Sequence, residues 1–191
     1  MRKKPLKKEI RILGIDDTPF NKFQDKECRV IGVVFRGGEF LDGVVSTTVE
    51  VDGMDATLKL IELVNLTKFH DQLRAIMLGG VAVAGFNVIN IRRLSEETGV
   101  PVIVVIRDYP DFDKMFAALK KLGMHEKVKL IERMPLPTKV DNIYVQYAGI
   151  ELKEVMQILK LSCTHSHFPE PLRVAHLIGQ GLVFGESKGR A

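Results

Sequence analysis

Apolar residues fall into short runs separated by turn residues, and the first part of the chain favours strands. Residues 10–15 predict a first strand, and residues 28–36 predict a second that ends at the turn pair Gly37 and Gly38. Residues 43–51 are rich in β-branched side chains and predict a third strand within hairpin distance of the second. The pattern therefore begins with three consecutive strands.

After Gly53 the pattern changes to an alternation of helices and strands. Leu58, Ile61 and Val64 have helical spacing, which predicts a helix directly after the third strand. The other predicted elements are an apolar strand at 73–80, a helix over 87–99, a buried strand at 100–106, a helix over 112–122, a strand at 142–148, and helices over 151–161 and 171–181.

This order of elements predicts an α/β fold. Three strands in hairpin succession followed by two right-handed strand–helix crossovers match a ribonuclease H-like mixed sheet with helices on both faces. Another mixed α/β sandwich is the alternative. The length of 191 residues is that of one domain, 1–191, with a basic N-terminal tail at 1–9.

The composition is that of a soluble globular protein. Hydrophobic residues make up 46% of the chain and charged residues 27%, and no apolar run approaches the roughly twenty residues of a membrane helix. The N-terminus lacks the apolar stretch of a secretory signal. Cys28 and Cys163 are far apart and form no CxxC motif, which suits a reducing compartment. We therefore expect a cytoplasmic protein without a membrane partner.

The charge leans toward a polyanionic partner. The formal net charge is +4, and five of the first eight residues are basic: Arg2, Lys3, Lys4, Lys7 and Lys8. Such a patch attracts phosphate, although solvated basic termini without a specific role are common. Charge alone leaves both interpretations open.

Two adjacent carboxylates, Asp16 and Asp17, end the first strand. A carboxylate at the carboxyl end of a central strand points into the crevice where α/β sheets bind ligands, and hard oxygen ligands suit Mg²⁺ or Mn²⁺. Cleavage with two ions needs several converging carboxylates, and Asp52 and Asp55 are the candidates to join the pair. A turn role for Asp17 and a helix-cap role for Asp55 are the alternatives.

The stretch "AGFNVIN", residues 84–90, is predicted to open a helix after a strand. There, Gly85 and its neighbours would offer backbone N–H groups to a phosphate or a base. Phe86 could stack on an extruded base, and Asn87 could hydrogen-bond a base edge. A turn glycine and a core phenylalanine are the alternative interpretation.

The motifs "LGIDD", "DGMDAT", "GGVAVAGFNVIN" and "FPEPLRVAH" resemble archaeal proteins classed as endonuclease dU, which are similar to endonuclease V. The resemblance covers nearly the whole chain. It implies a ribonuclease H-like fold and metal-dependent nicking of DNA at deaminated bases such as deoxyuridine or deoxyinosine, with Mg²⁺ or Mn²⁺ as cofactor. DNA is the implied partner, and RNA is a second candidate.

The resemblance also implies roles for individual residues. Asp16 falls where endonuclease V has the catalytic aspartate of its first strand, and Asp52 falls near a glutamate of its third strand. These two would hold the metal and carry catalysis, assisted by Asp17 or Asp55. Arg107 stands where endonuclease V ends a strand on a lysine, and it could meet a phosphate.

The chain departs from endonuclease V at three places. Gly79 occupies the aligned position of the third metal-binding aspartate, and Gly149 stands near a histidine. The prolines of the wedge with which endonuclease V separates DNA strands are missing here, and only the aromatic Phe40 remains at that place. The segment from Pro169 to His176 matches closely, and we interpret it as architecture. These departures keep open a non-catalytic nucleic-acid-binding or partner-binding protein on the same fold, and an enzyme with a closed nucleotide-sized pocket near Asp16.

Overall fold

The first three strands pair in antiparallel succession, as predicted. In the computed structural model, which describes residues 8–188, β1 (Arg11–Asp17) pairs with β2 (Glu27–Arg36), and β2 pairs with β3 (Phe40–Glu50). Of the predicted basic tail 1–9, residues 1–7 lie outside the described residues. Residues 8–10, the first that the structure describes, lead directly into β1.

Four further strands extend the sheet on the other side of β1. The order is β3–β2–β1–β4–β7–β9–β8, with β1, β4 and β7 parallel and the remaining neighbours antiparallel. This arrangement is a mixed α/β sheet, and the parallel strands bring the carboxyl ends of β1, β4 and β7 to one edge. The added strands are β4 (Leu73–Leu78), β7 (Val102–Ile106), β8 (Thr138–Val140) and β9 (Ile143–Ala148).

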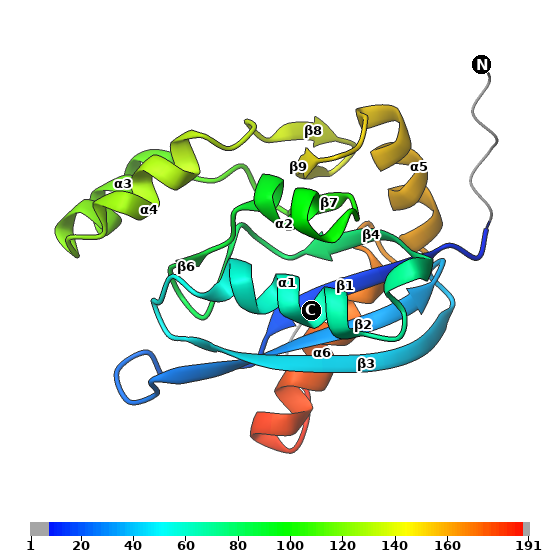
Figure 1. Ribbon diagram of the computed structural model, residues 1–191, viewed down its shortest axis with the longest axis horizontal. Helices are drawn as coiled ribbons and strands as arrows, with labels where there is room; N and C mark the ends of the chain where they lie inside the picture. The colour runs from blue at the N-terminus through cyan, green and yellow to red at the C-terminus, as the bar shows by residue number, and fades with distance from the viewer. Residues whose placement is uncertain (1–7, 189–191) are drawn as a thin grey trace.

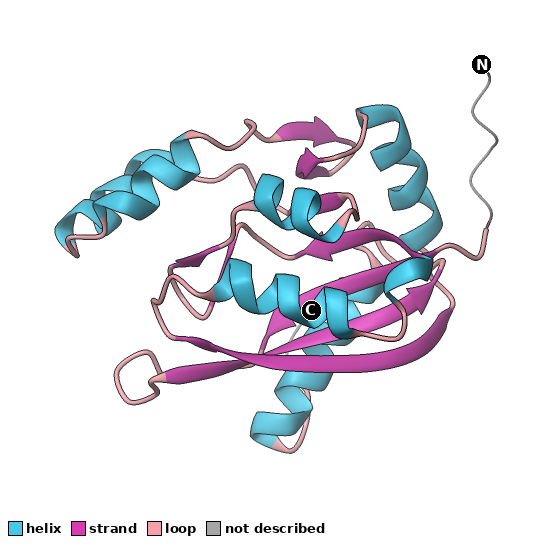
Figure 2. Ribbon diagram, in the orientation of Figure 1, coloured by secondary structure: helices cyan, strands magenta, loops and turns pink. Residues whose placement is uncertain are grey.

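Helices cover both faces of the sheet (Figures 1 and 2). One face packs against α1 (Ala56–Leu66) and α2 (Ile91–Thr98), and the other packs against α5 (Leu152–Ser162) and α6 (Glu170–Phe184). Within residues 8–188, no helix combines the length and hydropathy needed to cross a bilayer.

Side chains of β1 alternate between these two faces. Leu13 and Ile15 belong to the core under α1 and α2, whereas Ile12 belongs to the core under α5 and α6. The alternation continues to the end of the strand, so Asp16 faces α6 and Asp17 faces the opposite side. The two adjacent carboxylates are therefore separated by the sheet.

The predicted helix start within residues 84–90 is wrong. The chain forms a small hairpin there, β5 (Ala82–Val83) with β6 (Asn87–Val88), and α2 begins only at Ile91. Asn90 is the N-cap residue, because its side chain accepts a hydrogen bond from the Arg93 N–H. The cap thus ends the irregular segment and starts the helix.

Two helices between β7 and β8 form an arm beside the sheet. They are α3 (Phe112–Lys121) and α4 (His125–Glu132), and they extend together from the body of the molecule (Figure 1). The sequence pattern predicted only the first of them, and it also missed β8 and the short 3₁₀ turn η1 (His70–Gln72). The arm has a separate apolar cluster that includes Leu119 and Val128 and reaches Val88 in the hairpin.

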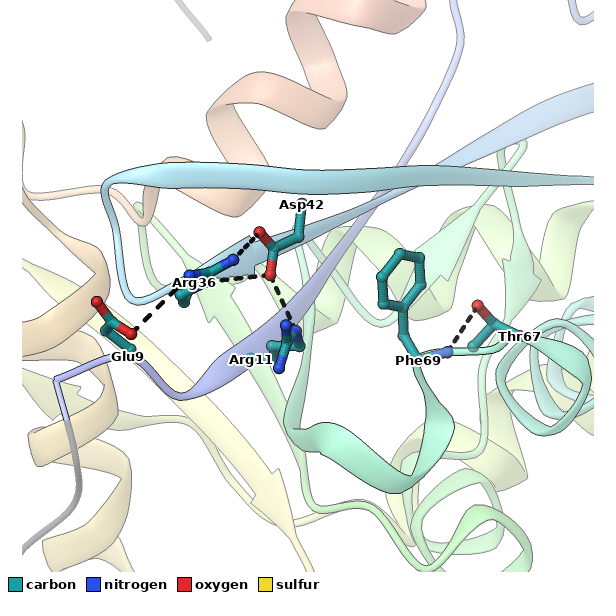
Figure 3. A network of polar contacts seen from close by, with 6 residues as sticks. All are labelled: Glu9, Arg11, Arg36, Asp42, Thr67 and Phe69. Atoms are coloured by element: carbon teal, nitrogen blue, oxygen red, sulfur yellow. Dashed lines mark hydrogen bonds and ion pairs between the residues drawn. The ribbon is translucent and has the colours of Figure 1, made fainter.

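A network of polar contacts around Asp42 lies at the end of the sheet opposite to Asp16 (Figure 3). The Asp42 carboxylate accepts hydrogen bonds from the guanidinium groups of Arg11 at 2.9 Å and Arg36 at 2.7 Å, and Arg36 lowers the pKa of this carboxyl. Arg36 also lies 3.9 Å from Glu9. In the same view, the Thr67 hydroxyl accepts the Phe69 N–H. This network joins β1, β2 and β3 at the end of β1 distant from Asp16.

We expect Gly14→Ala to destabilise the fold, because α6 crosses β1 in close contact with this glycine. An added Cβ would lie 2.4 Å from the backbone carbon of Pro171. The loss should be about 2–3 kcal/mol in the free energy of unfolding. Gly181→Ala on α6 is the matched control, because outside its own stretch of helix no atom of the described residues lies within 4 Å of its added Cβ. Urea unfolding of both variants tests the expectation, and equal stability would contradict it.

Candidate functional site

The first component of the site is the contact between Asp16 and His176. Asp16 lies near the carboxyl end of β1, and its Oδ2 is 2.8 Å from Nδ1 of His176 on α6. α6 follows β1 closely, since Gly14 contacts Pro171 and Gly179 contacts Thr18. The helix therefore delivers the imidazole to the carboxylate from one face of the sheet.

A chain of hydrogen bonds assigns the His176 tautomer. The Lys188 N–H donates to Gln180 Oε1 at 2.5 Å, which directs the Gln180 amide nitrogen to His176 Nε2 at 2.8 Å. Because an amide nitrogen is a donor, His176 Nε2 is the acceptor, and Nδ1 carries the proton that it donates to Asp16. In this arrangement the imidazole donates to the carboxylate and orients it.

The environment of Asp16 makes its ionised form less favourable than that of a carboxyl in water. Burial, with a further contribution from the neighbouring Asp17 carboxylate, raises the pKa of Asp16 to about 6, and the bond from His176 opposes this shift. Burial also raises the pKa of Asp17. A cation bound at Asp16 would reverse this effect, because it stabilises the ionised carboxylate.

Open space remains beside the second oxygen of Asp16. Gly79 follows β4, the neighbour of β1, and a Cβ added at Gly79 would lie 3.5 Å from Asp16 Oδ1. Apart from its chain neighbours, no other heavy atom of residues 8–188 would lie within 4 Å of that Cβ. Position 79 therefore adjoins the carboxylate, and its glycine has no side chain to supply a ligand.

Asp17 and Asp52 meet at a different place, the loop of the β5–β6 hairpin. Asp17 Oδ2 accepts the Ala84 N–H at 2.6 Å, and Asp52 Oδ1 accepts the Phe86 N–H at 2.7 Å. The Asp52 N–H in turn donates to the Ala84 carbonyl at 2.9 Å. The expectation that this loop offers free N–H groups to a phosphate therefore does not hold for Ala84 and Phe86, since two carboxylates occupy them.

The geometry of this loop requires a glycine at position 85. Gly85 has a φ of 83°, and a Cβ there would lie 2.4 Å from Asp52 Oδ1. Asp52 itself has a φ of 53°. Its backbone carbonyl accepts a hydrogen bond from the Lys127 ammonium of α4, and Lys127 is only 4% exposed. Burial lowers the pKa of Lys127. The arm thus secures the turn that carries Asp52.

Asn87 and Asp55 have structural contacts. Asn87 is fully buried, its Oδ1 accepts the Ala56 N–H at 3.0 Å, and its Nδ2 donates to the Glu50 carbonyl and to Asp55 Oδ1. The amide of Asn87 is therefore already paired and is not exposed to a base edge. Asp55 stands at the N-cap position of α1, but its carboxylate makes no capping bond to that helix.

The structure does not gather the predicted metal ligands Asp16, Asp17, Asp52 and Asp55 into one group. Among residues 8–188, no cluster of three or more His, Cys, Asp or Glu side chains is arranged to hold a metal ion. Asp16 faces α6, whereas Asp17 and Asp52 bind the hairpin loop. An ion would thus have Asp16 as its protein ligand, with water or substrate oxygens completing the coordination.

The remaining predicted residues divide between the two ends of the sheet. Arg107 directly follows β7 at the Asp16 end, and its guanidinium lies 4.6 Å from the centre of the Phe168 ring. Phe40 begins β3 at the opposite end and is 57% exposed. Gly149 also lies at that far end, after β9. Phe40 and Gly149 are therefore separate from the candidate site.

The sequence interpretation missed the contribution of His176. His176 and Gln180 are four residues apart, so they share one face of α6. This spacing, from the last residue of "PEPLRVAH" to Gln180 four residues later, was the available signal for a polar face. The contact with Asp16 bridges 160 positions and depends on how α6 crosses the sheet.

Comparison with known proteins assigns the family. The model of the endonuclease dU family matches residues 8–183. The chain belongs to the endonuclease dU family. A UPF0215 protein of Methanothermobacter thermautotrophicus is 48% identical over 191 residues, covering 97% of this chain and 94% of the relative. One from Methanopyrus kandleri is 43% identical and covers all of both chains.

Two solved structures have folds similar to that of this endonuclease dU family member. A crystal structure of a protein of unknown function from Archaeoglobus fulgidus has a TM-score of 0.86 and 36% identity, covering 93% of this chain and 100% of that one. Endonuclease V of Ciona intestinalis, solved with a 24mer DNA containing an inosine followed by a ribo-adenosine, has a TM-score of 0.59 and 16% identity, covering 90% and 84%. The endonuclease dU fold is therefore similar to that of endonuclease V.

Proposed function

We propose that this protein is a divalent-metal-dependent endonuclease, with a ribonuclease H-like fold, that nicks DNA at or near deaminated bases such as deoxyuridine or deoxyinosine. Family membership and the similarity to endonuclease V support a nuclease. The inosine-containing DNA bound by the Ciona protein supports the choice of substrate. RNA is a further candidate substrate.

One observation carries the proposal. The carboxylate of Asp16 is fixed through Oδ2 by His176, while Oδ1 faces the open space at Gly79. A hydrogen-bonded carboxylate with one available oxygen is the arrangement in which outer residues orient a metal ligand. Its place at the carboxyl edge of the parallel strands is where α/β sheets bind their ligands.

The donor set fits one Mg²⁺ or Mn²⁺ ion better than two. Mg²⁺ is commonly bound by one or two carboxylates together with water and substrate phosphate, and Asp16 offers such a carboxylate. When bound, the ion would neutralise charge on the phosphate and lower the pKa of water. Asp16 would hold the ion, His176 would keep Asp16 in place, and Asp17 and Asp52 would fix the adjoining hairpin loop.

Incubation with labelled DNA tests the activity. A duplex with a single deoxyuridine or deoxyinosine, and the matched undamaged duplex, would be incubated with the protein and Mg²⁺, Mn²⁺ or EDTA. We expect nicking of the modified duplexes with either metal and none with EDTA. No nick with either metal would refute the proposal.

A non-catalytic nucleic-acid-binding or partner-binding protein on the same fold is the second candidate. Gly79 and the absence of a three-residue metal cluster within residues 8–188 favour it. Binding of the same duplexes without cleavage, with affinity that falls steeply as salt rises, would identify this function.

The third candidate is an enzyme with a closed nucleotide-sized pocket at Asp16, and three pockets among the described residues lie away from this carboxylate. A pocket of about 540 Å³ lies between α5 and the β8–β9 hairpin, and Asp16 does not line it. Smaller pockets of about 290 and 320 Å³ also lie elsewhere.

We expect His176→Ala to reduce cleavage about ten- to a hundredfold, the usual effect of losing a residue that orients a metal ligand. His176→Asn should retain more activity than His176→Ala, because the amide of the asparagine can donate to Asp16. Cleavage as a function of Mn²⁺ concentration measures both variants. Wild-type activity and metal dependence in His176→Ala would show that the contact is only structural.

A further inference from the structure

Arg173 and Glu170 form an unusual pair at the start of α6. Glu170 is only 2% exposed, and one of its oxygens, Oε2, accepts hydrogen bonds from Arg173 Nε at 2.8 Å and Nη2 at 2.6 Å. The other oxygen, Oε1, is buried and has no hydrogen-bond partner within residues 8–188. A buried carboxylate with an unpaired oxygen costs stability, so a need for helix stability alone does not account for it.

The pair fixes a guanidinium about one helical turn before His176. Arg173, His176 and Gln180 are spaced at i, i+3 and i+7, so they share one face of α6. His176 on this face contacts Asp16. The Arg173 side chain is 37% exposed, and Glu170 is its only side-chain hydrogen-bond partner among the described residues. Its Nη1 donors therefore remain available to a ligand.

A second guanidinium approaches from the sheet. Ile103 and Val105 of β7 face the core under α5 and α6, so strand alternation places Arg107 on the same face as Asp16. Its guanidinium lies over Phe168, two residues before α6. Arg107, from the end of β7, thus lies near the start of α6, the helix that carries Arg173.

We propose that Arg173, held by the buried carboxylate of Glu170, forms with Arg107 a subsite that binds a backbone phosphate of the nucleic acid beside Asp16. This inference rests on the proposed function and deepens it. An arginine whose fork is oriented in advance binds phosphate through two N–H donors and loses little conformational freedom. Glu170 is a positioning residue, since it acts through Arg173.

Equilibrium binding tests the subsite separately from cleavage. The intact protein would be titrated into a fluorescein-labelled duplex with one deoxyinosine, in EDTA, over a range of NaCl concentrations, with anisotropy as the readout. We expect Arg173→Gln to bind about tenfold more weakly, with the slope of log K against log salt reduced by about 0.9, the loss of one phosphate contact. Arg92→Gln on α2 is the control for loss of one exposed positive charge.

Two further variants keep the test valid if Arg173→Gln disturbs folding. Arg173→Lys keeps the charge but not the fork, so it should retain the salt slope and bind about threefold more weakly. Glu170→Gln leaves Arg173 charged but less oriented, so it too should keep the slope and lose affinity. Melting temperatures of all variants would be compared with that of the wild type. Arg173→Gln, Arg173→Lys and Glu170→Gln variants that all bind with the affinity of Arg92→Gln would overturn the subsite.

Nicking by the wild type, measured in parallel, separates the two proposals. If the wild type nicks the duplex and Arg173→Gln behaves like Arg92→Gln, the subsite is wrong and the nuclease stands. If the wild type binds without nicking and Arg173→Gln loses one phosphate contact, the nuclease is wrong and the subsite stands. A wild type that binds no nucleic acid would overturn both.

Discussion

Asp16→Asn should reduce metal-dependent nicking about a thousandfold, the order expected when a charged group that stabilises the transition state is lost. The amide oxygen can still accept the His176 N–H, so the orientation of the side chain is preserved while its charge is removed. Initial nicking rates with saturating Mn²⁺ measure the effect. Unchanged nicking would place the metal elsewhere.

Asp17→Asn is the matched control. An amide oxygen can still accept the Ala84 N–H, and the side chain lies on the opposite face of the sheet from His176. We therefore expect a loss of less than about tenfold. Equal losses in the two variants, with unchanged melting temperatures, would show that the carboxylates act together.

Asp16→Asn should also change how stability depends on pH. Because burial raises the pKa of Asp16 from 3.8 to about 6, its proton favours the native state, and this stability is lost as the pH rises from about 4 through 6. The amide variant lacks this loss. Without metal, it should be more stable than the wild type at pH 7 by an amount on the order of 2 kcal/mol. Urea unfolding at pH 4 and pH 7 measures the difference.

The sequence pattern was sufficient for elements with strong periodicity or complete burial. Strands β2 and β7 are almost continuous apolar runs, and both were predicted. The pattern failed where local signals conflicted. Residues 87–90 continue apolar spacing into α2, and only the Asn90 cap separates the hairpin from the helix. The three-residue strand β8 follows two prolines, so its sequence is typical of a loop.

The candidate site was only partly accessible from sequence because its contacts are long-range. Asp16 could be predicted from its place at the end of a buried strand. The contact with His176 could not, because it depends on the course of α6 along β1. Asp52 illustrates the converse. Its position after β3 suggested a metal ligand, but its positive φ turns the carboxylate toward the Phe86 N–H.

Gly79→Asp should strengthen metal binding at the site about tenfold, because a second carboxylate would adjoin Asp16. The backbone at Gly79 lies outside the left-handed region, and an added Cβ would meet only Asp16 Oδ1, at 3.5 Å. Without metal, repulsion between the carboxylates should lower the melting temperature. With Mn²⁺ the melting temperature should rise more than in the wild type, because ion binding to the native state is tighter.

Gly79→Asn separates charge from volume in this experiment. The asparagine has nearly the same size, but it adds no negative charge, so its melting temperature should respond to Mn²⁺ as the wild type does. Thermal unfolding of the three proteins over a series of Mn²⁺ concentrations gives the comparison without requiring activity. If Gly79→Asp and Gly79→Asn respond equally to Mn²⁺, Asp16 does not hold the ion. A larger response in Gly79→Asp would instead support an ion at Asp16.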